Sequence, residues 1–201
     1  MRTISEKSLS DYIAEQLADE ILSGRIPGGR RLRQEELAKT FHASRIPVRE
    51  ALQILEGQGL VIRLVTKRIL VSEFDKEGIE TIYQTICGIL KQSIQSILKN
   101  HKETVLQRKL VEDNYQFEWA IFECVENRYL SQLLKNGVDC YLRFALSIGG
   151  RLEPIVSKRK VISNMLTVRE FEPVDIELTQ YFEWLADIVN EEREKNQVHN
   201  F

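Results

Sequence analysis

The chain has 201 residues, of which 43% are hydrophobic, which suits one large domain or two small ones. Its 28 Lys and Arg residues nearly balance its 30 Asp and Glu residues, so the formal charge of −2 indicates no class of partner. No apolar run approaches the roughly 20 residues that cross a bilayer, and residues 1–20 contain no signal-peptide block, so we expect a cytoplasmic protein without a membrane partner.

Three helices are expected in the first part of the chain. Apolar side chains recur every four residues over 8–26, which predicts the first helix. Residues 27–31 contain a proline and two glycines and predict a turn. A short second helix is expected over 34–41. A third is expected over 44–57, because Ser44 is a favourable N-cap residue at its start.

A β-hairpin should follow the third helix. Residues 60–65 and 69–74 are rich in β-branched residues and are separated by only three residues, 66–68. Three helices followed by a hairpin are the plan of a winged helix-turn-helix. Residues 25–68 carry ten basic and four acidic residues. This local excess of positive charge, unlike the overall balance, indicates a nucleic-acid partner.

The rest of the chain is predicted to be helical. From residue 75 onward apolar residues keep a helical spacing, and Pro173 separates the last two expected helices, 155–168 and 174–189. The predicted fold is therefore mainly α. It combines a winged helix-turn-helix of three helices plus a β-hairpin over residues 1–74 with an all-α helical bundle over residues 75–201.

The third helix carries a family resemblance. Residues 44–52 read S-R-I-P-V-R-E-A-L and closely resemble the recognition-helix signature S-R-x-P-V-R-E-A-L of the GntR family of bacterial regulators. Leu55 and Gly59-Leu60 continue the signature, and residues 27–38 resemble the family's P-G-x-x-L-x-E-x-x-L-A segment. The resemblance implies a sequence-specific DNA-binding transcriptional regulator, most often a repressor in such families.

The same helix suggests which residues read DNA. A helix can enter the major groove, where arginine binds guanine O6 and N7 in a bidentate manner, and Arg45 and Arg49 lie one turn apart near the helix start. Arg33 and the Ser44 hydroxyl could hold phosphates. The predicted DNA-contacting residues are Arg33, Ser44, Arg45, Arg49, Gln53, Lys67 and Arg68.

The expected wing differs from the family pattern. Lys67 and Arg68 lie at the hairpin tip, where they could reach the DNA backbone or the minor groove. The family usually has a glycine near this tip, and Arg68 occupies that place in our alignment. Because glycine tolerates a positive φ better than other residues, the replacement calls the wing geometry into question.

The helical part resembles, more weakly, the FCD (FadR C-terminal) type of effector domain. Residues 117–130 fit its D-x-x-F-H-x-x-I…N-x-x-L stretch. Typical members hold a divalent metal with an Asp and three His. The corresponding positions here are Asn114, Glu118, Arg159 and Trp184. An amide, an arginine and an indole are poor metal ligands, so we predict that no metal and no cofactor bind.

The resemblance makes residues 75–201 an effector-binding and dimerisation domain. We expect a homodimer on double-stranded operator DNA, with a small organic effector, anionic in character, that modulates its affinity. Four polar residues in amphipathic segments are candidates for the effector pocket: Asn114, Glu118, Arg143 and Arg159. The alternative is a constitutive DNA-binding dimer whose helical domain binds no ligand.

An enzymatic function is not expected. The three histidines are scattered, and the three cysteines lie far apart within apolar-periodic segments. The chain contains no phosphate-binding loop and no recognisable pair of nucleophile and base. The cysteines are expected to be buried small hydrophobic residues.

Overall fold

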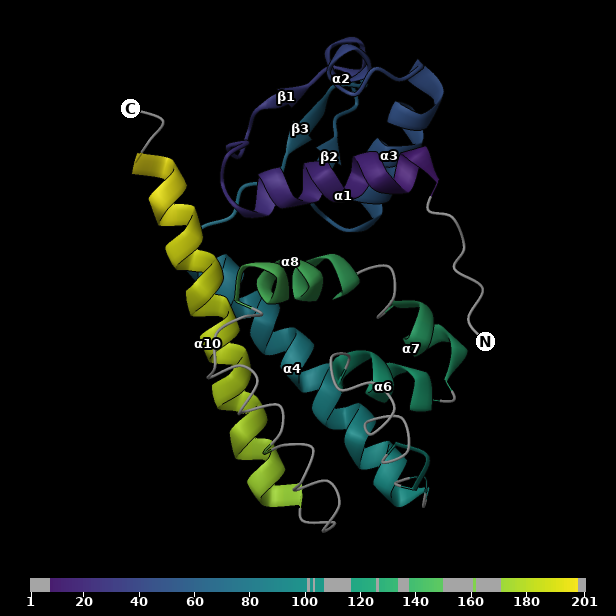
Figure 1. Cartoon of the computed structure of the whole chain (residues 1–201), viewed down its shortest axis with the longest axis vertical. Helices are drawn as coiled ribbons and strands as arrows, with labels where there is room; N and C mark the ends of the chain where they lie inside the picture. The colour runs from purple at the N-terminus through teal and green to yellow at the C-terminus, as the bar shows by residue number, and fades with distance from the viewer. Residues whose placement is uncertain are drawn as a thin grey trace. The chain divides into compact units, whose positions relative to one another are not determined.

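A computed structural model of the chain describes most of its residues and divides into two compact units (Figure 1). The first unit contains 1–74 together with 191–201, and the second contains 75–190. The predicted second domain covers residues 75–201, whereas residues 191–198 at the end of α10 group with the first unit in the structure. The described residues are 8–100, 102, 104–106, 117–125, 127–133, 138–149, 161 and 171–198.

The first helix, α1, spans Leu9–Leu22. A capping box starts it: the Ser8 hydroxyl accepts a hydrogen bond from the Asp11 N–H at 3.1 Å, and the Asp11 carboxylate accepts one from the Ser8 N–H at 3.2 Å. The helix ends earlier than predicted because Gly24, with a φ of 79°, turns the chain away. One face of α1 is buried through Ile13, Ala14, Leu17, Ala18, Ile21 and Leu22.

Helices α2 and α3 follow at Gln34–Thr40 and Arg45–Gly57, close to the predicted ranges. Ser44 occupies the N-cap position of α3, but its hydroxyl makes no capping hydrogen bond. The buried face of α3 packs against α1 and has the predicted apolar spacing: Val48, Ala51, Leu52 and Leu55. This packing fixes the orientation of the opposite, polar face of α3.

The strands form a small antiparallel sheet with the order β1-β3-β2. Strands β2, Val61–Arg63, and β3, Ile69–Val71, make the predicted hairpin, although both are shorter than expected. The third strand, β1, Arg31–Leu32, was not predicted and pairs with β3. Arg31 was assigned to a turn because a two-residue strand leaves no periodic pattern in the sequence.

The tip of the hairpin is a tight turn with one strained residue. The Leu64 N–H donates to the Arg68 carbonyl at 2.9 Å, and the Lys67 N–H donates to the Leu64 carbonyl at 2.8 Å. Lys67 has a φ of 61°, in the left-handed region that favours glycine. The wing residue in the glycine-favouring conformation is therefore Lys67, the neighbour of the predicted Arg68.

Replacing Lys67 with glycine should stabilise the first unit by about 0.5–1 kcal/mol, because the left-handed conformation costs a side-chain-bearing residue more than glycine. The measurement is hydrogen exchange of peptides from residues 8–74 in the full chain across a urea series. Thr66→Gly is the control, since Thr66 lies in the same turn and its φ is not positive. Equal effects of the two substitutions would show that Lys67 is not strained.

Every described element of the second unit is helical, as the fold class predicted. The helices are α4, Lys76–Lys99; α6, Phe117–Cys124; α7, Arg128–Leu133; α8, Asp139–Gly149; and α10, Phe171–Val198, whose residues up to 190 belong to this unit. Pro173 lies in the first turn of α10, where proline is tolerated. The helix predicted over 155–168 falls almost entirely outside the described residues.

The interior of the second unit is apolar, with a few buried polar groups. The buried Tyr83 hydroxyl donates a hydrogen bond to the Tyr141 carbonyl at 2.8 Å, which joins α4 to α8. All three cysteines are buried, as predicted. Within the described part of the chain, no helix has the length and apolar character needed to cross a membrane.

Candidate nucleic-acid interface

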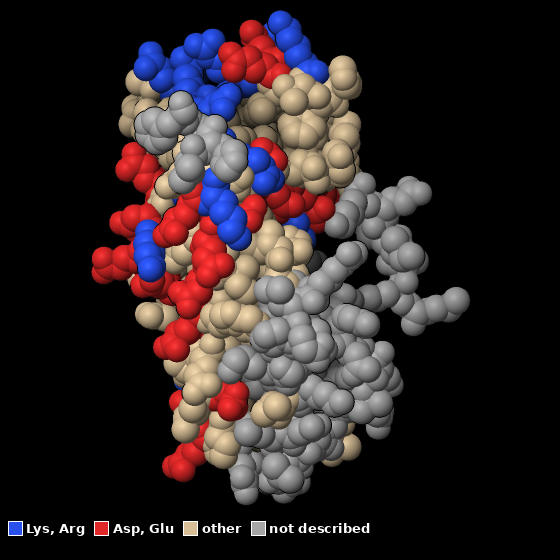
Figure 2. Space-filling view, turned by 60° about the vertical axis from the view of Figure 1, so that its left-hand side comes forward, with Lys and Arg blue, Asp and Glu red and all other residues tan. Residues whose placement is uncertain are grey.

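A surface hollow of about 330 Å³ in the first unit gathers most of that unit's predicted DNA-contacting cations. Five basic side chains line it, together with Leu32, Gln34, Glu35 and Ile69. Figure 2 shows Lys and Arg side chains concentrated over this unit, at the top of the view. The basic residues that line the hollow are Arg31, Arg33, Arg45, Lys67 and Arg68.

Four separate segments supply these cations. Arg31 lies in β1, Arg33 immediately precedes α2, and Arg45 is the first residue of α3. The wing turn supplies Lys67 and Arg68. The pairing of β1 with β3, in which Arg31 lies opposite Leu70, places the β1 cation beside the wing. The hollow therefore depends on the sheet as well as on the helices.

Two of the arginines form ion pairs with carboxylates on α2. The Arg45 guanidinium lies 2.9 Å from a Glu35 carboxylate oxygen, and that of Arg33 lies 3.0 Å from a Glu36 oxygen. Both pairs are well exposed; the Arg45 and Glu35 side chains are 71% and 69% accessible. Exposed pairs of this kind contribute only about 0–1 kcal/mol. A phosphate or a guanine edge can therefore replace the carboxylate at little cost.

The remaining predicted DNA-contacting residues do not line the hollow but are exposed. Arg49 and Gln53 lie on α3 one and two turns after Arg45, on the face opposite the buried residues. Ser44 is exposed at the start of the same helix. A surface that continues from the hollow along α3 thus includes all seven predicted residues.

Sequence reasoning missed Arg31, which the structure adds to this surface. A signal was present, since the run Arg30-Arg31-Leu32-Arg33 is unusually basic. Its glycine- and proline-containing neighbours led to the prediction of a turn. The pairing with β3 that orients Arg31 involves a residue 39 positions away, and nothing local in the sequence indicates it.

The effector-pocket candidates are only partly described. Glu118 on α6 is fully buried, at 0% exposure, and its carboxylate accepts a hydrogen bond of 2.7 Å from the Tyr181 hydroxyl. Arg143 on α8 is half-buried. Asn114 and Arg159 lie outside the described residues. The structure therefore places Glu118 in the interior of the helical unit, and whether the four candidates form one site stays a prediction.

The described residues offer few groups that could bind a metal ion or act as nucleophiles. Among them, no group of three or more His, Cys, Asp or Glu side chains is arranged to hold a metal ion. Burial raises the pKa of Cys87 to about 11 and that of Cys140 to about 12. Both therefore remain neutral thiols near pH 7, which makes them poor nucleophiles and poor ligands.

Comparisons with known proteins found similar transcriptional regulators. Two Bacillus subtilis (strain 168) proteins are similar: the uncharacterized HTH-type transcriptional regulator YdhC, 24% identical over 62% of this chain, and the gluconate operon transcriptional repressor, 27% identical over 66%. The matches span 64% and 62% of those proteins, less than two thirds of each. The structure of Lar, which controls the expression of the Listeria monocytogenes agr system, resembles the fold with a TM-score of 0.58.

The Lar likeness covers 92% of this chain and 98% of that one at 18% identity, so it bears on the fold alone. The N-terminal part matches a family model. Residues 9–71, which contain the hollow, α3 and the wing, match the family described as bacterial regulatory proteins, gntR family. This segment is therefore similar to the helix-turn-helix region of bacterial transcriptional regulators of the gntR type.

Proposed function

We propose that this protein is a repressor that binds double-stranded operator DNA through the hollow and the exposed face of α3. The observation that carries the proposal is the convergence of five cations, from four segments, beside the first turn of the family's signature helix. Phosphate contacts by such cations supply affinity and position, and contacts to base edges supply specificity.

The residues divide into two roles. Arg45 and Arg49 lie one helical turn apart on the exposed face of α3, which suits bidentate contacts to guanine in the major groove. Arg31 and Arg33, in and just after β1, are proposed to hold phosphates. The exposed ion pair of Arg45 with Glu35 orients the guanidinium before DNA arrives and is exchanged on binding.

We propose that the active form is a homodimer, with the helical unit as the dimerisation and effector-binding domain. A single small DNA-binding unit buries limited surface on DNA, whereas two copies can read two half-sites. A repressor role is favoured by the similarity to the gluconate operon transcriptional repressor. The helical unit is proposed to be of the FCD type.

The test is selection of bound fragments from genomic DNA by the full-length protein. We expect a pseudo-palindromic site with half-site centres about 10 base pairs, or roughly 34 Å, apart, bound by a particle of twice the chain mass. Light scattering of the free protein and of the complex gives the stoichiometry. A monomer that binds a non-repeated site tightly would contradict the dimer, and no enrichment over random DNA would contradict the function.

We also propose that an effector controls the affinity for the operator. We infer that a small organic anion binds in the helical unit, with Arg143 or Arg159 as its partner and with Asn114 and Glu118 as further candidates. Support for a polar interior comes from the fully buried Glu118, since a carboxylate is costly to bury without a specific role. Operator affinity that no metabolite changes would favour the constitutive alternative.

A further inference from the structure

The end of α10, residues 191–198, belongs to the first unit, although the helix begins in the second. Its most buried charged residue is Arg193, which is only 7% exposed. The Arg193 guanidinium donates hydrogen bonds to the carbonyls of Ile21 and Leu22, at 2.9 and 3.0 Å, and to the carbonyl of Phe74 at 3.0 Å. It also lies 5.7 Å from the centre of the Phe74 ring.

These acceptors lie where the helix runs short of donors. Ile21 and Leu22 are the last two residues of α1, and the final carbonyls of a helix lack the next turn of N–H donors. The Ile21 carbonyl also accepts a hydrogen bond from the Gly24 N–H at 3.1 Å, so Arg193 adds a second donor there, and at the Leu22 carbonyl it supplies a donor that α1 does not. A cation at this end also interacts favourably with the helix dipole. The planar fork of Arg193 satisfies carbonyls from two segments at once, which the single ammonium of a lysine cannot reproduce with the same geometry.

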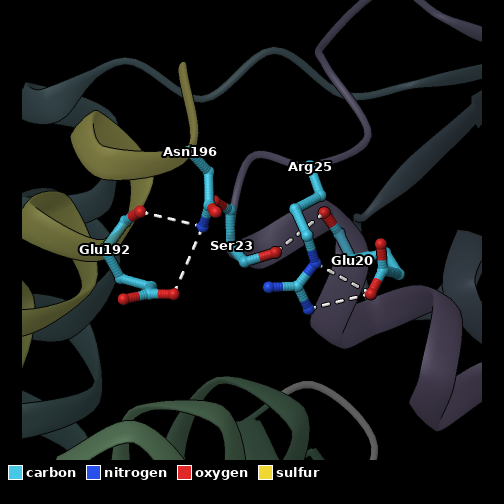
Figure 3. A network of polar contacts seen from close by, with 5 residues as sticks. All are labelled: Glu20, Ser23, Arg25, Glu192 and Asn196. Carbon is cyan, nitrogen blue, oxygen red and sulfur yellow. Dashed lines mark hydrogen bonds and ion pairs between the residues drawn. The ribbon is translucent and has the colours of Figure 1, made fainter. Parts of the chain in front are cut away.

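Neighbouring contacts hold the same junction (Figure 3). The Asn196 amide donates to the Ser23 carbonyl and to the Glu192 carbonyl, both at 3.0 Å. Gly24 also lies beside Arg193: a Cβ added at Gly24 would be in ordinary van der Waals contact with the Arg193 Cα, at 3.6 Å. Ser23 itself is fully buried. The α10 end therefore packs tightly over the end of α1.

The two segments that Arg193 joins carry the DNA-reading elements. Helix α1 packs against α3, which presents Arg45 and Arg49. Phe74 follows β3, the central strand of the sheet that carries the wing. A change where Arg193 joins the end of α1 to Phe74 would therefore alter the position of α3 relative to the wing.

We infer that the α10 end completes the DNA-binding unit and that Arg193 is a positioning residue for operator recognition. The affinity part rests on the proposed function, whereas the structural part does not. Arg193 contacts no DNA in this scheme. Its role is to hold the end of α1 and the chain after β3 in one arrangement. In that arrangement α3 and the wing can contact the DNA at the same time.

The test compares Arg193→Met with Lys195→Met in the full-length protein. Lys195 is an exposed cation two positions further along the same helix, so its replacement matches the change in charge. For Arg193→Met we expect amide exchange over residues 21–26 to rise about tenfold or more, since buried carbonyls lose their donor. Operator affinity should fall by a similar factor, and Lys195→Met should change neither by more than about twofold.

Two milder variants cover the case in which Arg193→Met does not fold. Arg193→Lys keeps the charge but not the fork, and Asn196→Ala removes only the contact to Ser23. Both should raise exchange over residues 21–26 by less than Arg193→Met. Unchanged exchange in all three variants would overturn the inference.

The two readouts also separate this inference from the proposed function. Raised exchange with unchanged operator affinity would overturn the positioning role. If the wild-type protein binds no DNA, the proposed function fails. Raised exchange in Arg193→Met would then still support the structural part, and unchanged exchange would overturn it.

Discussion

Arg45→Ala and Arg49→Ala should each lower affinity for the selected operator by about 1–3 kcal/mol, with a smaller loss on random DNA. Both side chains lie on the exposed face of α3, and α3 is the family's signature helix. A bidentate contact to guanine is lost with the guanidinium, whereas a phosphate contact would be lost equally on every sequence. Fluorescence anisotropy on both DNAs at one fixed salt concentration measures the difference.

Arg25→Ala is a matched control for this pair of variants. Arg25 lies in the same unit and forms an exposed ion pair with Glu20 at 2.8 Å, as Arg45 does with Glu35, but it does not line the hollow. Its replacement should leave both affinities nearly unchanged. If Arg45→Ala or Arg49→Ala weakens binding to both DNAs equally, that arginine is a phosphate contact and not a base contact.

Leu52→Ala should destabilise the first unit by about 2–5 kcal/mol. Leu52 is 0% exposed on the face of α3 that packs against α1, so the shortened side chain leaves a cavity in the centre of this unit. A loss of this size is a large part of the stability of a small domain. Operator binding should therefore fall with the folded fraction, although Leu52 is buried and does not line the hollow.

Hydrogen exchange of peptides from residues 8–74 in a urea series measures this loss. Ile46→Ala is the control on the same helix, because Ile46 is 60% exposed and its truncation should change stability by about 0.5 kcal/mol or less. Similar losses for the two variants would mean that the α1–α3 interface does not form the core of the unit.

Local sequence patterns were sufficient to predict the helices of the first unit. The spacing of apolar residues in α1 and α3 repeats along each helix, and the capping box at Ser8 involves residues three positions apart. Strand β1 has only two residues, and its partner in β3 lies far along the chain. The positive φ of Lys67 at the wing tip was not predicted, because turn geometry depends on the hydrogen bonds that close the turn.

The candidate site also combines residues that a local sequence pattern predicts with residues that only distant contacts position. Arg33, Arg45, Lys67 and Arg68 were predicted, and the structure places them around one hollow. The family signature made this possible. Arg193 is separated from its partner Ile21 by 172 positions, and an isolated arginine near the end of a helix resembles a solvated surface charge. Only the folded chain reveals that its side chain is buried against the end of α1 and Phe74, within the first unit.

The position of Arg193 near the end of the chain also delays completion of the first unit during translation. Arg193 leaves the ribosome about 120 residues after Phe74, and synthesis at about 5–20 residues per second makes this delay on the order of ten seconds. Throughout that interval the Leu22 and Phe74 carbonyls lack the hydrogen bonds that Arg193 donates to them in the finished protein. A nascent or prematurely released polypeptide would therefore contain α3 without the Arg193 contacts that hold the end of α1 and Phe74. We expect such a fragment to bind the proposed operator less tightly than the full-length protein.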